Sequence, residues 1–208
     1  MEIIFDYPFK IALIGASLIG ISSGIISCYA VLKEQSLLGD AIAHAALPGI
    51  CLAFLLTLNR SPNILLIGAM TGGIIGMVLI TTIIRKSIIK EDTALGIILS
   101  VFFGFGTLLL TIIQKIPTAR QAGLDSYLFG NAATMLIGDL KVIASLTIII
   151  SLVTLLFWKE FKVIIFDTDH AKSQGFPVVK IELILTTLIV IAIVIGLQTV
   201  GVILMSAM

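Results

Sequence analysis

Apolar residues gather in six long stretches of this 208-residue chain, and the short segments between them hold most of the charged residues. Each stretch has roughly the 20 residues that a helix needs to cross a bilayer. The pattern predicts spans near residues 11–32, 41–58, 64–84, 94–114, 141–158 and 181–205. A shorter apolar stretch at 124–140 is a re-entrant or interfacial helix, or part of a seventh span. We therefore expect an all-α polytopic membrane protein with about six to seven transmembrane helices.

The composition agrees with this interpretation. Hydrophobic residues make up 59% of the chain and charged residues only 12%, whereas soluble domains carry about 25% charged residues. The first apolar stretch is too long for the core of a signal peptide, so we expect it to stay in the membrane. The net charge of +1 offers no basic surface for nucleic acid. We expect residues 1–208 to form a single transmembrane domain.

One ionisable stripe interrupts the apolar pattern at the start of the second predicted span. Asp40, His44 and Pro48 are spaced four residues apart, so a helix places them on one face. Pro48 has no N–H and leaves the carbonyl of His44 without its usual intrahelical donor. Ionisable groups within a membrane are costly and generally face a cavity or a partner. The stripe predicts a stopping place for a cation; the alternative is that Asp40 caps the helix and His44 is a core residue.

The longest polar segment, residues 159–180, follows the fifth predicted span. Lysines and arginines are most numerous in the loops after the first, third and fifth spans, and this bias places the segment in the cytoplasm. Asp167 or Asp169 is suited to cap a short helix that ends near Gly175, with Pro177 preventing its continuation. The pattern therefore predicts one or two turns of helix outside the bilayer.

Sequence motifs for catalysis or nucleotide binding are absent. The chain contains no GxxxxGK[ST], HExxH or GxSxG pattern and no cysteine-rich metal motif. We therefore expect no enzyme, and any ATP hydrolysis that drives transport has to take place in a partner.

The residues Gly39–Gly49, GDAIAHAALPG, closely resemble the pattern GDxxxHxxLPG of the manganese/zinc/iron family of ATP-binding-cassette permeases. Four further segments are similar to weaker family motifs: Glu91–Ile97, Tyr127–Gly130, Phe166–Pro177 and Gln198–Leu204. Family members continue for several dozen residues beyond the last motif. The resemblance therefore implies part of a type II importer permease fold, from a fragment or a C-terminally truncated gene.

The resemblance also implies a function in the bacterial inner membrane. It assigns Asp40 and His44 to the metal, and Pro48 and Gly49 to the pathway and its helix break. It assigns the contact with the ATPase to Asp167, Ala171, Gly175 and Pro177. The implied partners are a second permease copy, a cytoplasmic ATPase dimer and an extracytoplasmic metal-binding lipoprotein or solute-binding protein. The implied cargo is manganese, zinc or iron, with no permanently bound cofactor.

Two other functions stay open at this point. An ATP-independent channel or secondary carrier would use the same aspartate and histidine for protons or cations. A permease for metal chelates would need a wide, uncharged pathway, and this function does not explain the presence of Asp40 and His44.

Two copies of the Asp40–His44–Pro48 stripe would supply two carboxylates and two imidazoles, a set of ligands that suits manganese, iron or zinc.

Overall fold

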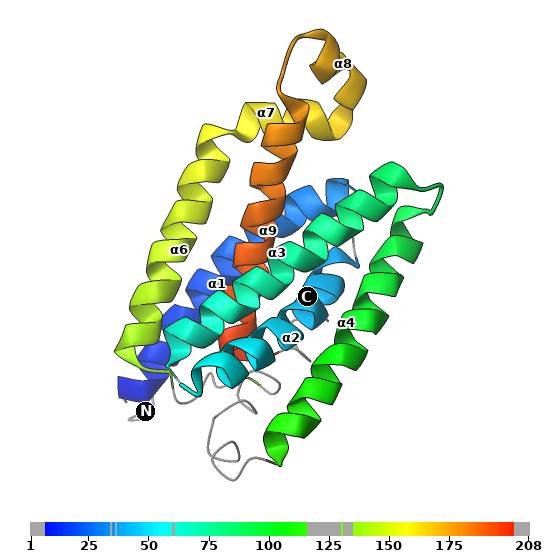
Figure 1. Cartoon of the computed structure of the whole chain (residues 1–208). Helices are drawn as coiled ribbons and strands as arrows, with labels where there is room; N and C mark the ends of the chain where they lie inside the picture. Colours follow the sequence, from blue (N-terminus) through cyan, green and yellow to red (C-terminus); the bar gives the residue numbers. More distant parts are fainter. Residues whose placement is uncertain are drawn as a thin grey trace. The chain divides into compact units, whose positions relative to one another are not determined.

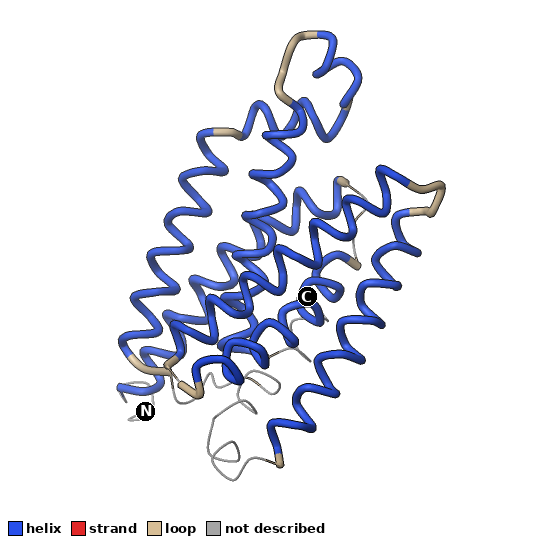
Figure 2. Tube along the Cα trace, in the orientation of Figure 1, coloured by secondary structure: helices blue, strands red, loops and turns tan. Residues whose placement is uncertain are grey.

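A computed structural model describes residues 7–33, 35, 37–59, 61–115, 130 and 135–201. All regular structure within these ranges is helical (Figures 1 and 2). Six of these helices are long and apolar enough to cross a membrane, and each overlaps one predicted span: α1 (Tyr7–Leu32), α2 (Leu38–Thr57), α3 (Pro62–Lys86), α4 (Glu91–Gln114), α6 (Ile137–Leu156) and α9 (Val178–Val200). The all-α polytopic membrane fold is confirmed.

Several predicted boundaries differ from the observed helices by a few residues. The fifth span does not reach residue 158, because α6 ends at Leu156 and a separate helix, α7 (Trp158–Phe166), follows. Helix α9 ends at Val200, where the next residue, Gly201, adopts a φ of +84°, and residues 202–205 of the predicted last span lie outside the described residues. In the stretch 124–140, residues 137–140 form the first turn of α6, while 124–129 and 131–134 lie outside the described residues.

The described residues form two units. One comprises residues 37–131 and 193–208 and is built around α2, which packs along both α3 and α4. Gly68, Gly72 and Gly76 form a row of glycines along α3. The contact there is close: a methyl group on Gly72 would lie 2.7 Å from the carbonyl oxygen of Ala45, and one on Gly76 would lie 2.6 Å from the Cβ of Ala45. This row of glycines is therefore a helix-packing surface, because small residues let the backbones of two membrane helices approach each other closely.

The other unit comprises residues 1–36 and 132–192. In it α1 packs along α6 and also contacts α7. An ion pair of 2.7 Å joins Lys33 Nζ, after the end of α1, to Glu182 Oε1 in the second turn of α9. A short helix, α8 (Thr168–Ser173), connects α7 to α9. This unit presents the polar segment 159–180 as two short helices outside the membrane-length ones.

Candidate metal site and coupling segment

Asp40 lies in the first turn of α2 but does not cap it. Leu37 occupies the N-cap position, and no side-chain cap hydrogen bond is present there. The alternative that Asp40 serves as a helix cap is therefore wrong. The helix N-terminus still favours a negative charge at this position, because its first N–H groups point toward it. This leaves the carboxylate available for another partner.

Asp40 and His44 come together as the stripe predicts. Asp40 Oδ1 lies 3.1 Å from His44 Nε2, and the two side chains are 27% and 18% exposed, respectively. The angles at this contact are not those of a hydrogen bond: Asp40 Oδ1 and His44 Nδ1 are both buried without a hydrogen-bond partner. An unsatisfied buried polar atom costs about 1–3 kcal/mol. Buried polar atoms in native proteins normally have a partner, so these two atoms are suited to bind water or an ion.

An aromatic side chain from α4 completes the surroundings of His44. The ring of Phe103 lies edge-to-face against the imidazole, with a centroid separation of 4.9 Å and an interplanar angle of 77°. Phe103 is a site residue that the sequence did not predict. Its only signal was an apolar aromatic residue in a span, and that does not indicate which ring faces a histidine. Phe103 limits how the imidazole can rotate.

Pro48 and Gly49 continue the stripe into an apolar groove. Helix α2 runs through Pro48 without ending. Both residues help to line a cavity of about 620 Å³ between α2, α3 and α4, where only Thr57 and Thr71 contribute polar side chains. Such a lining offers a bare cation little replacement for its hydration shell. The groups able to bind a metal are therefore those of Asp40 and His44.

A single copy of the chain supplies too few donors for a complete metal site. Among the residues that the structure describes, no group of three or more histidine, cysteine or carboxylate side chains could hold a metal ion. Asp40 and His44 give one carboxylate and one imidazole, whereas zinc usually takes four ligands in proteins. These two residues fit half of a metal site.

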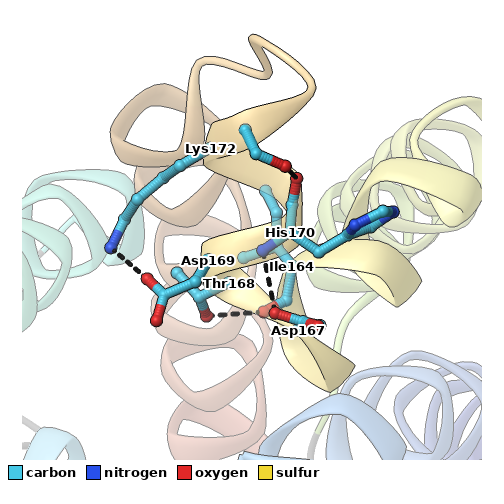
Figure 3. A network of polar contacts seen from close by, with 7 residues as sticks. Ile164, Asp167, Thr168, Asp169, His170 and Lys172 are labelled. Carbon is cyan, nitrogen blue, oxygen red and sulfur yellow. Dashed lines mark hydrogen bonds and ion pairs between the residues drawn. The ribbon is translucent and has the colours of Figure 1, made fainter.

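The predicted coupling residues shape the second short helix. Asp167 is the N-cap of α8, and its Oδ1 accepts a hydrogen bond of 2.8 Å from the backbone N–H of His170 (Figure 3). The next residue, Thr168, donates its hydroxyl to the carbonyl of Ile164 at 2.9 Å. Lys172 and Asp169 form an exposed ion pair of 3.0 Å on the same helix. Of the two candidate caps, Asp167 is therefore the one used.

The end of α8 is a Schellman motif, as a glycine at this position favours. Gly175 has a φ of +80°. Its N–H donates to Lys172, and the N–H of Phe176 donates to Ala171, at 3.0 and 3.1 Å. Ala171 is fully buried. Pro177 directly precedes α9, and its carbonyl accepts the N–H of Ile181 at 3.2 Å. The ends of α8 are thus defined by hydrogen bonds and turns that involve Asp167, Ala171, Gly175 and Pro177, and the polar side chains of α8 are exposed.

Other motif segments are described in part. Glu91–Ile97 forms the start of α4. Residues 127–129 and 202–204 lie outside the described residues. Gly130 has a φ of +79°, and a methyl group there would meet the carbonyl of Val200 near the end of α9. The backbones of two motif segments therefore come into contact in the unit that contains α2.

Comparisons with known proteins agree with these features. The model of the ABC 3 transport family matches residues 6–208. The zinc transport system membrane protein TroC of Treponema pallidum is 48% identical over all of this chain and 70% of its own length. The manganese transport system membrane protein MntC of Bacillus subtilis is 50% identical over 94% of this chain and 45% of its own length.

A solved structure supports the same fold. The structure titled PsaBC from Streptococcus pneumoniae in complex with Fab superposes with a TM-score of 0.80 at 35% identity. The match covers 97% of this chain and 69% of that chain. The described helices thus follow the architecture of a longer membrane protein.

Proposed function

Because this chain belongs to the ABC 3 transport family, we propose that it is a permease subunit of an ATP-binding-cassette importer for divalent manganese, zinc or iron. The observation that carries this proposal is the pair Asp40–His44, whose buried Oδ1 and Nδ1 atoms have no hydrogen-bond partner within a membrane-length helix. The names of its relatives, which include zinc and manganese transport systems, support the class of cargo.

The chemistry of the pair suits an ion in transit. A neutral imidazole and a carboxylate are borderline ligands that bind manganese, iron or zinc without the thiolates that favour copper. Two copies related by a two-fold axis bring two Asp40 carboxylates and two His44 imidazoles, with a charge of −2 that offsets the cation. This sparse ligand set allows release as well as binding. Pro48 and Gly49 continue the pathway past the ligands.

The energy comes from a cytoplasmic ATPase dimer that docks on α8. This proposal is supported by the rigid cap and Schellman turn that hold Asp167, Ala171, Gly175 and Pro177. Because this connection is short and held by hydrogen bonds, a movement of the ATPase that displaces α8 also displaces α9. An extracytoplasmic metal-binding protein delivers the ion to the other side of the membrane.

Reconstitution separates this function from an ATP-independent channel or carrier. Proteoliposomes with the permease, its ATPase and the metal-loaded binding protein should accumulate radiolabelled manganese or zinc only when ATP is supplied. An ATPase variant that binds but does not hydrolyse ATP is the matched control. Equal accumulation with and without ATP hydrolysis would reject the proposed importer.

A further inference from the structure

Helix α7 begins directly after a membrane-length helix. Only Phe157 separates its first residue, Trp158, from Leu156, the last residue of the membrane-length helix α6. Helix α7 runs crosswise to α6, beyond the end of that helix (Figure 1). A short helix that turns crosswise where a span ends lies in the plane of the interface.

The inner face of α7 is fixed to the protein. Phe161 is 1% exposed and Ile164 is 3% exposed. The ring of Phe161 packs edge-to-face against Tyr29 of α1, with centroids 5.6 Å apart. This packing sets the rotation of α7 about its axis, so the direction of its outer face is also set.

The outer face of α7 combines aromatic rings with positive charge. Trp158 is 51% exposed and Phe166 is 68% exposed. Lys159 and Lys162 are exposed beside them, and neither forms an ion pair within the described part of the chain. At about 100° per residue, these four side chains fall within one sector of about 100°. A purely water-facing surface would not gather two large aromatic rings.

We propose that this outer face, formed by Trp158, Lys159, Lys162 and Phe166, binds the anionic lipids of the surrounding bilayer. Tryptophan is favoured at the level of the headgroups, where its ring is buried and its N–H stays hydrated. Each lysine near the membrane surface raises the affinity for anionic headgroups by about fivefold. Their long stems let the ammonium groups reach the phosphates while the rings remain deeper.

This surface has a consequence for the neighbouring helix. Asp167 alone separates α7 from α8. An α7 held against the headgroups therefore keeps α8 at a fixed height above the membrane. The lipid contact does not depend on the metal-import function, and the two can fail separately.

Trp158 makes the proposal directly measurable, because it is the only tryptophan of the chain. The full chain is placed in two kinds of phosphatidylcholine nanodisc. One contains brominated phosphatidylglycerol, and the other contains the same fraction of brominated phosphatidylcholine. Bromine quenches tryptophan at short range. We expect Trp158 to be quenched by both lipids, and more strongly by brominated phosphatidylglycerol.

Charge variants test the role of the lysines. The double variant Lys159→Gln/Lys162→Gln should lose the preference for phosphatidylglycerol. The preference for this lipid over phosphatidylcholine should fall by about fivefold for each lysine removed. The matched control, Lys172→Gln/Lys180→Gln, removes two other exposed lysines and should keep the preference. Circular dichroism of each variant confirms that its helices are intact.

Three results would overturn the proposal. The first is a Trp158 that brominated lipids do not quench and that aqueous acrylamide quenches freely. The second is equal quenching by the two brominated lipids in the unchanged chain. The third is a Lys159→Gln/Lys162→Gln variant that keeps its lipid preference but no longer copurifies with the ATPase, since the face would then dock a protein.

Discussion

Gly49 of α2 lies directly against Gly72 of α3: a methyl group built on Gly49 would stand 2.9 Å from the Cα of Gly72 and 3.0 Å from its backbone nitrogen. The same methyl group would also meet the carbonyl oxygen of Gly68. The atoms that crowd the position belong to backbone, so they cannot move away as a flexible side chain can. This contact holds α2, which carries Asp40 and His44, against α3.

The substitution Gly49→Ala should destabilise the protein because it forces α2 and α3 apart. Overpacking of a close contact typically costs about 1–3 kcal/mol. The measurement is the thermal unfolding midpoint of the purified chain in detergent. Gly24→Ala is the matched control, because a methyl group at Gly24 has nothing within 4 Å in the structure. An equal midpoint for both variants would contradict the close contact.

The substitution Asp167→Ala should loosen α8, because it removes the only side-chain cap at the start of this short helix. Loss of an N-cap costs about 1 kcal/mol. We expect faster amide exchange at His170, and weaker coupling of ATP hydrolysis to metal uptake. Asp169→Ala removes an exposed carboxylate from the same helix and serves as control. If Asp169→Ala uncouples the complex as much as Asp167→Ala does, the cap is not the relevant feature.

Much of the fold follows from the sequence because a bilayer imposes a simple rule. Lipid leaves no water for backbone groups, so long apolar stretches become helices. The start and the end of α8 could also be predicted, because Asp167 and Gly175 each form hydrogen bonds only with residues that are near them in the sequence. Asp40 and His44 meet because a four-residue spacing fixes their common face.

The missed features depend on tertiary structure. The predicted fifth span includes Trp158, the first residue of α7, because the sequence shows no break in the apolar pattern before that residue. The contact of Phe103 with His44 arises from the packing of α4 on α2, which no local pattern encodes. The end of α9 at Val200 depends on the positive φ of Gly201. Glycine permits that conformation but does not require it.

The substitution Phe103→Ala should weaken metal binding, because the imidazole of His44 loses the ring that limits its rotation. Aromatic pairs contribute about 0.5–1.5 kcal/mol beyond their buried area. We expect the metal concentration for half-maximal uptake to rise by up to about tenfold. Phe105→Ala, which removes a ring that lines the apolar groove, is the control. The same rise in both variants would assign the effect to general packing.

Uptake should fall as the pH is lowered, because a protonated imidazole cannot bind a metal ion. An imidazole ligand has to lose its proton before it binds a metal ion, so metal binding weakens as the proton concentration rises. The readout is the initial rate of manganese uptake at fixed ATP, with ATPase activity measured in parallel. The variant His170→Gln should show the same pH profile. A flat profile in which ATPase activity stays constant would contradict ligation by His44.

The most direct test of the central claim is metal uptake by complexes with Asp40→Asn or His44→Gln. Each substitution keeps a polar side chain of similar size but removes the carboxylate or the imidazole that is proposed to bind the metal. Asp92→Asn and His170→Gln, which change exposed residues elsewhere, are the matched controls. Assembly with the ATPase is confirmed by copurification. We predict that both site variants lose radiolabelled manganese or zinc uptake while both controls retain it. Uptake at the normal rate by either assembled site variant would contradict the proposed site.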